Sequence, residues 1–187
     1  MVGLHAQFVG LDVGCMVRGG IQLCCAPLKK TKRPIVEELI EIINEIIKYG
    51  LNPNIEIEEK ERDLEMNLVK LYSKYFQVKY KPDENEYEYF DKKKIYPNVI
   101  ENVKNNFKDF GWYHSILNLE EILKEPEIGT GDAIDDLSDI IYDLLEIKWR
   151  KENNSGNDGW WFFELMFYGH TQQHLINLLN YLKNKND

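Results

Sequence analysis

The chain has 187 residues, of which 43% are apolar and 29% charged, and its formal net charge is −9 at pH 7. These values predict one soluble globular domain, and no apolar run is long enough to predict a membrane span. Three cysteines are too few for a disulfide framework. A sequence pI near 5.0 argues against a general nucleic-acid backbone binder. We therefore expect neither a nucleic-acid nor a membrane partner.

Residues 1–30 differ in composition from the rest of the chain. They hold all three cysteines and five of the twelve glycines, but no Glu, Asn or Tyr. Their net charge of +2 leaves −11 on residues 31–187. The segment lacks the basic start and unbroken apolar stretch of a secretory signal. We expect a poorly ordered N-terminal extension over 1–30, a single helical domain over 31–187 and, because the cysteines are unpaired, a cytoplasmic location.

Three helices are predicted in the first part of this domain. The first begins at Pro34, a residue suited to the first helical turn, and ends at Gly50. The second carries Leu and Tyr side chains at three- and four-residue spacing from Leu64 to Tyr75. The third begins at Pro97 and ends at Gly111.

The connections between these helices are less regular. The polar stretch Lys79–Tyr96 predicts a loop, and a short strand at Tyr87–Phe90 within it is compatible with the sequence. Trp112–Leu119 fits either a strand or an extended connector, and Gly129–Gly131 predicts a hinge-like loop.

Two long helices are predicted at the end of the chain. The first covers about Ala133–Arg150, with Asp132 as its N-cap. Asn153–Gly159 predicts a turn, and the last helix covers roughly Trp160–Lys183. Helices without alternating strands indicate an all-α bundle of about five helices, with a small β element around 77–119.

Five aspartates lie close together at the start of the first of these two helices: Asp132, Asp135, Asp136, Asp139 and Asp143. At ~100° per residue, four of them fall within roughly 60° of one another. This acidic stripe consists of Asp132, Asp136, Asp139 and Asp143. Apolar side chains such as Leu137 and Ile141 lie on the opposite side of the helix. The periodicity therefore predicts that the stripe faces solvent rather than the bundle interior, where a metal site would lie.

The stripe carries an electrostatic cost. Like charges three or four residues apart each destabilise a helix by roughly 0.2–0.5 kcal/mol. The helix dipole offsets this cost in the first turn but not at Asp139 and Asp143. A divalent cation, a basic residue elsewhere in the chain or a basic partner would compensate the repulsion. A solvated face that tolerates it is the simplest alternative.

His170 and His174 have the spacing that lets two imidazoles of one helix reach one metal ion. The zinc-protease pattern requires Glu directly after the first His, and Thr171 occupies that position. Two His among aromatic residues are more often hydrogen-bonded core residues. If the pair met the acidic stripe, a mixed carboxylate–imidazole site would form. Its candidate ligands are Asp132, Asp136, Asp139, His170 and His174.

Other enzyme signatures are missing from the sequence. It has no Gly-rich phosphate loop, no G-x-S-x-G elbow and no plausible Cys–His pair outside residues 1–30. The sequence therefore assigns no catalytic residue and no cofactor, with a divalent metal ion as the alternative.

An ordered set of motifs resembles a bacterial family. The set is GDAIDDLSDI at Gly131–Ile140, WFFE at Trp161–Glu164, and GH followed by HL at Gly169–Leu175. These motifs resemble the family named domain of unknown function 5063, over about residues 35–183. The resemblance implies a helical domain of small bacterial proteins. It transfers no catalytic residue, because the family has no established activity.

Three functions are compatible with these observations, and the sequence favours the first over the other two. The first is a non-enzymatic binding module, like immunity or adaptor proteins, that uses the five aspartates to bind a basic protein partner, with Tyr87–Phe90 as a second contact. The second is a divalent-metal-dependent hydrolase built on the Asp and His residues. The third is a purely structural accessory domain.

Overall fold

The computed structural model describes residues 34–83, 85, 87 and 90–185. The predicted N-terminal extension lies outside these residues. The described elements are α1 (Ile35–Leu51), α2 (Lys60–Tyr75), α3 (Lys92–Ile95), α4 (Val99–Asn106), β1 (Trp112–Ile116), β2 (Ile128–Asp132), α5 (Ala133–Asn153), α6 (Gly156–Met166), a π-helical turn (Phe167–Thr171) and α7 (Gln172–Lys185). The prediction of a mostly helical bundle with a small β element is confirmed. In the described residues, no helix is long and apolar enough to cross a membrane.

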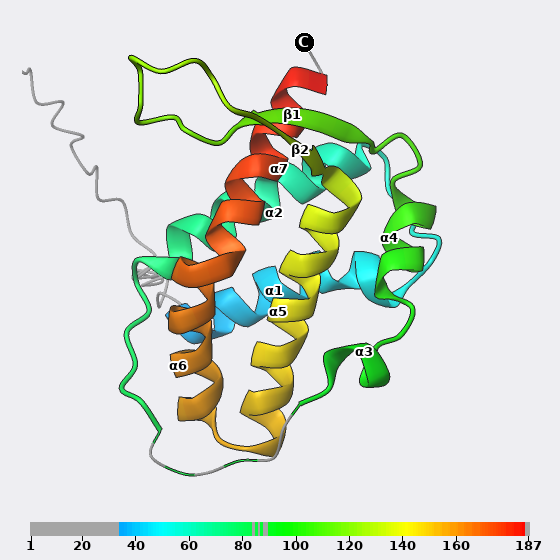
Figure 1. The fold of residues 1–187 in the computed structure, drawn as a ribbon. Coiled ribbons are helices and arrows are strands. Elements are labelled where there is room, and N and C mark those ends of the chain that lie inside the picture. Colours follow the sequence, from blue (N-terminus) through cyan, green and yellow to red (C-terminus); the bar gives the residue numbers. More distant parts are fainter. Residues whose placement is uncertain (1–33, 84, 86, 88–89, 186–187) are drawn as a thin grey trace, which may run out of the picture. The chain divides into compact units, whose positions relative to one another are not determined.

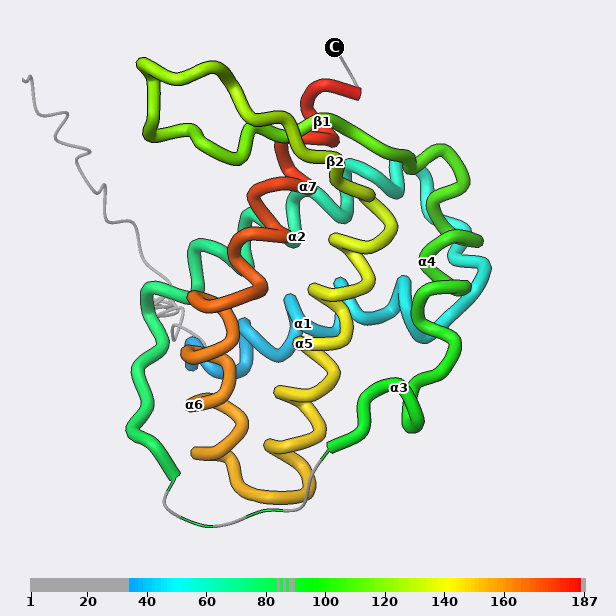
Figure 2. Tube along the Cα trace, viewed as in Figure 1, coloured from blue at the N-terminus to red at the C-terminus, as the bar shows by residue number. Residues whose placement is uncertain are grey.

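Helix α5 occupies the middle of the bundle (Figure 1). Helices α1, α4, α6 and α7 all contact it. Figure 2 shows α6 and α7 following one another alongside α5, in the opposite direction. Because neighbours cover α5 on several sides, three of its polar side chains are buried as well as most of its apolar ones. Asp136, Ser138 and Asp143 all lie in the interior.

The apolar core follows the predicted helical periodicity. Leu39, Ile43 and Ile46 of α1 are fully buried, and each such side chain contributes about 1.5–3 kcal/mol through burial. The side chain of Asn106, at the end of α4, accepts from the backbone N–H of Ile55 and donates to two carbonyls at the end of α1. These bonds tie the connection after α1 to α4.

The last predicted helix is divided by the π-helical turn. Its first part begins at Gly156 rather than Trp160, because Ser155 caps it by accepting a hydrogen bond from the Asp158 N–H. The predicted turn over Asn153–Gly159 is therefore wrong in its second half. The π-turn inserts one extra residue before α7, and such turns occur frequently at functional sites.

Strands β1 and β2 form an antiparallel hairpin in which Tyr113 pairs with Gly131. The strand alternative for Trp112–Leu119 is confirmed for its first five residues, whereas the predicted hinge at Gly129–Gly131 is wrong. The physical reason is the Tyr113 side chain. A Cβ on Gly131 would lie 2.2 Å from Cζ of Tyr113, so glycine lets the ring cross the opposite strand.

Replacing Gly131 with alanine is expected to lower the free energy of unfolding by about 1–3 kcal/mol, because the ring of Tyr113 must move. Gly111→Ala is the matched control, since a Cβ there meets nothing within 4 Å. Urea denaturation of both variants measures the difference. Equal stability of the two variants would show that the ring has room to move without cost.

The predicted strand at Tyr87–Phe90 includes residues 88 and 89, which lie outside the described part of the chain. Tyr87 and Phe90 themselves belong to no strand.

Candidate metal centre

Three side chains from three elements of the fold converge beside the middle of α5. They are Asp139 of α5, His170 of the π-turn and His174 of α7. One possible ligand atom from each lies within 4.8 Å of the other two. The Nε2 atoms of the two imidazoles are 3.2 Å apart, and Nε2 of His174 is 3.7 Å from Oδ2 of Asp139.

A buried carboxylate orients each histidine from behind. Nδ1 of His174 lies 2.8 Å from Oδ1 of Asp136, and Nδ1 of His170 lies 2.7 Å from Oδ2 of Asp143. Metal-binding histidines commonly donate their second ring N–H to such a carboxylate, which fixes the tautomer and the ring orientation. The two Asp–His pairs therefore have the arrangement of an outer coordination shell.

Asp143 is the most enclosed carboxylate of the site, with a side chain that is 0% exposed. In addition to His170, it accepts a hydrogen bond from the Thr171 hydroxyl at 2.9 Å. Nζ of Lys92, on α3, lies 3.3 Å from its other oxygen. Two adjacent residues of the π-turn thus reach the same oxygen, and Lys92 balances the buried charge.

The tautomers have a chemical consequence. An ionised carboxylate only accepts hydrogen bonds, so each Nδ1 carries the proton that it donates, and an imidazole with no second proton then presents a bare Nε2. Two bare nitrogens at 3.2 Å repel each other unless a proton or a metal ion lies between them. A tetrahedral ion with Zn–N bonds of 2.0–2.1 Å separates two nitrogens by about 3.3 Å. The observed spacing fits such an ion.

Asp139 is suited to be the third ligand. It makes no hydrogen bond within the described part of the chain, apart from its longer ion-pair approach to His174. Burial raises the pKa of the Asp139 carboxyl and outweighs the attraction of the two histidines. The hydrogen bond to Asp136 raises the pKa of His174 against the opposing effect of burial. The shift at Asp139 thus comes from burial and the shift at His174 from the adjacent Asp136 carboxylate, and a divalent cation would neutralise the negative charge of these carboxylates.

The site is open on one side. The side chains of His170, Asp139 and His174 are 39%, 32% and 22% exposed, respectively. Three protein ligands with an accessible side leave a coordination position for water or substrate, as in catalytic rather than structural metal sites.

The predicted orientation of the acidic stripe is wrong for two of its four members. Asp136 and Asp143 are buried and face the two histidines instead of solvent. The periodicity argument assumed one buried face on α5, but neighbouring helices cover several. Asp132 caps α5 by accepting from the Ile134 N–H, as predicted, and takes no part in the cluster.

Of the five aspartates predicted to bind a partner, Asp135 alone is classed as exposed. Of the five predicted metal ligands, the structure brings Asp139, His170 and His174 together and places Asp136 behind His174. Sequence reasoning missed Tyr113, Thr171 and Lys92 as outer contacts. The one available signal was the charge repulsion at Asp143, for which a basic residue elsewhere in the chain was one of several expected compensations, and Lys92 is such a residue.

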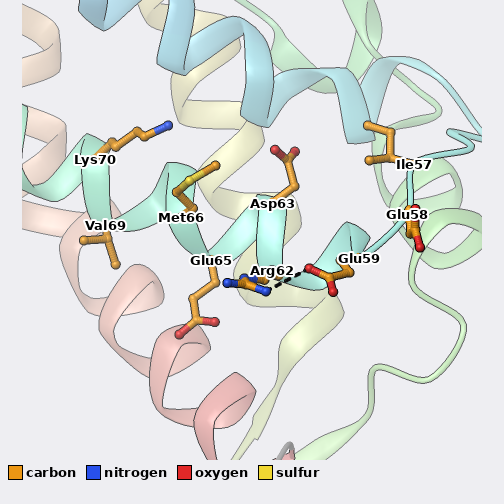
Figure 3. Close-up of a pocket in the computed structure, with 9 residues that line it drawn as sticks. All are labelled: Ile57, Glu58, Glu59, Arg62, Asp63, Glu65, Met66, Val69 and Lys70. Atoms are coloured by element: carbon orange, nitrogen blue, oxygen red, sulfur yellow. Dashed lines mark hydrogen bonds and ion pairs between the residues drawn. The ribbon is translucent and has the colours of Figure 1, made fainter.

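A groove of about 590 Å³ lies on another face of the bundle, along α2 (Figure 3). Its lining is mixed: Met66 and Val69 are apolar, whereas Arg62 and Glu59 form an ion pair with each other. Asp63 points from α2 toward α1, where it accepts hydrogen bonds from other side chains. The groove contains no histidine or cysteine, so it offers fewer kinds of metal ligand than the cluster on α5.

The Asp63 carboxyl is expected to make the free energy of unfolding depend on pH. Burial alone raises the pKa of this carboxyl, but hydrogen bonds from Lys48 and Tyr49 outweigh burial and hold the pKa below its ordinary value. The ionised form therefore stabilises the fold above the unfolded pKa of about 3.9, and this stability is lost as the pH falls through the folded value. In urea titrations between pH 5 and pH 2, Asp63→Asn should lose less stability than the unsubstituted chain. Glu58→Gln, at an exposed position, should follow the unsubstituted curve, and parallel curves for all three would contradict the prediction.

No family model, curated protein or solved structure matches this chain. The resemblance to the family named domain of unknown function 5063 stays a prediction.

Proposed function

We propose that this chain binds one divalent first-row transition-metal ion through Asp139, His170 and His174, and that it is a metal-dependent hydrolase. The supporting observation is the pair of imidazoles whose Nε2 atoms lie 3.2 Å apart while each Nδ1 contacts a buried carboxylate. Two nitrogen ligands with one carboxylate suit zinc, iron, cobalt or nickel better than magnesium or calcium.

The proposed chemistry follows from the open side of the site. A divalent ion held there would lower the pKa of a coordinated water toward 7 and would so supply a nucleophile at neutral pH. The chain's own part is to hold the three ligands. Asp136 and Asp143 keep the imidazoles in the tautomer that coordinates metal, and Lys92 limits the negative charge around Asp143.

Metal titration of the chelator-treated full chain tests this proposal. We expect one equivalent of Zn²⁺ or Co²⁺ to bind and the melting temperature to rise, since an ion at a thousand times its Kd adds about 4 kcal/mol of stability. Mg²⁺ at the same concentration should give a much smaller shift. Absence of stoichiometric binding would overturn the metal centre. If the metal-loaded protein hydrolyses no ester, phosphoester or amide of a broad panel, the proposed metal centre stands and the proposed hydrolase activity is contradicted.

The alternative of a protein-binding module rests on the charge of −11 over residues 31–187 and on Asp135, whose side chain is exposed. Asp136 and Asp143 contribute little to such a surface, because their oxygens are buried against the histidines. A structural accessory domain would use the same buried hydrogen bonds for stability alone. These two functions predict no selective response to Zn²⁺ or Co²⁺.

A further inference from the structure

The β1–β2 hairpin touches the outer shell of the candidate metal centre. The hydroxyl of Tyr113, on β1, donates a hydrogen bond to Oδ2 of Asp136. The other oxygen of the same carboxylate lies 2.8 Å from Nδ1 of His174. A chain of hydrogen bonds therefore runs from the hairpin through Asp136 to one of the three candidate ligands.

The hairpin is built to place this hydroxyl. Gly131 lies opposite Tyr113 and leaves room for the ring to cross β2 toward α5. The ring of Tyr181, on α7, contacts the Tyr113 ring with centroids 5.6 Å apart. Strand β2 then leads directly into α5, whose first turn is capped by Asp132. The position of the phenol is thus fixed from β2, α5 and α7 together.

The two Asp–His pairs differ in how their carboxylates are held. Asp143 has two further partners, the Thr171 hydroxyl and the ammonium of Lys92. Asp136 has the Tyr113 hydroxyl as its one further donor within the described part of the chain. Removing that hydroxyl leaves a nearly buried carboxylate oxygen without a donor, which favours rotation of the carboxylate away from His174.

We infer that Tyr113 is a positioning residue of the metal centre. Through Asp136 it keeps Nε2 of His174 directed at His170 and Asp139. This inference rests on the proposed metal site and adds the hairpin to it. Tyr113 contacts none of Asp139, His170 and His174 itself, so it acts on them through the Asp136 carboxylate and through its hydrogen bond with Asn177 of α7.

The test compares Co²⁺ binding by Tyr113→Phe and by the unsubstituted full chain. The variant keeps the ring over Gly131 and removes only the hydroxyl. We expect Co²⁺ affinity to fall roughly 10- to 100-fold, the range found for outer-shell changes, and the visible Co²⁺ absorption spectrum to change. The matched control is Tyr49→Phe. Tyr49 lies on α1, and its hydroxyl also donates a hydrogen bond to a carboxylate, that of Asp63 on α2, at 2.9 Å. Its Co²⁺ affinity and spectrum should match those of the unsubstituted chain.

The outcomes separate this inference from the proposal beneath it. If the unsubstituted chain binds no Co²⁺, the metal centre itself is wrong. If it binds Co²⁺ and Tyr113→Phe binds with the same affinity and spectrum, the role of Tyr113 is overturned while the centre stands. An equal loss in Tyr49→Phe would also overturn it. Should Tyr113→Phe fail to fold, Gly131→Ala displaces the same ring and must likewise weaken Co²⁺ binding for the inference to hold.

Discussion

A variant with alanine in place of His174 is expected to bind Co²⁺ at least about a hundredfold more weakly than the unsubstituted chain. His174 is one of three candidate ligands, and it lies within reach of both others. Its removal leaves one imidazole and one carboxylate, which hold a divalent ion poorly. Titration of chelator-treated protein, followed by heat and by visible absorption, measures the loss. His170→Ala should behave in the same way.

His114→Ala is the matched control for this experiment, because His114 lies exposed on β1 and belongs to no candidate metal cluster among the residues that the structure describes. It should bind Co²⁺ as the unsubstituted chain does. A comparable loss in this control would indicate adventitious binding by surface histidines. Unchanged binding in His174→Ala would show that the ion, if one binds, lies elsewhere.

Asp143→Ala is expected to cost the metal-free protein about 3–5 kcal/mol of unfolding free energy, the usual effect of breaking a buried charge pair. The carboxylate is fully buried and holds His170, Thr171 and Lys92 at once. Its loss leaves the hydroxyl without its carboxylate partner and the ammonium without its countercharge. Urea denaturation with chelator present measures the change independently of any metal.

Asp135→Ala serves as the control for Asp143→Ala. Asp135 lies on the same helix but is exposed, so its replacement should change stability by less than about 1 kcal/mol. Because a single destabilised variant has many explanations, the diagnostic quantity is the difference between the two aspartates. Equal effects at both positions would mean that the buried contacts of Asp143 contribute no net stability.

Much of the fold could be predicted from residue patterns. The apolar spacing in Ile35–Leu51 and the Asp132 cap of α5 led to correct helices. The hairpin was only partly predictable, because Gly129 and Gly131 have the composition of a loop. Gly131 lies against the Tyr113 ring and Gly129 against Leu117, and such contacts across the hairpin leave no periodic signal.

The candidate site was predictable in its residue types but not in its geometry. The His170–His174 spacing and the cost of charge at Asp139 and Asp143 both indicated a metal ion among the alternatives. A helical wheel nevertheless placed the stripe in solvent, since it shows directions around one helix and not what covers them. Only the packing of α6 and α7 against α5 shows that Asp136 and Asp143 of this stripe lie in the interior.

The π-turn between α6 and α7 has a consequence for the phase of the helices that it joins. One inserted residue shifts the angular register of everything after it by roughly 100° relative to an uninterrupted helix. Phe163 and Phe167 therefore stay packed against Tyr75 of α2, while His174 is free to face α5. The continuous helical segment from α6 to α7 therefore directs its side chains in two ways. The extra residue of the π-turn sets the angle between the aromatic side chains before it and the histidine side chain after it.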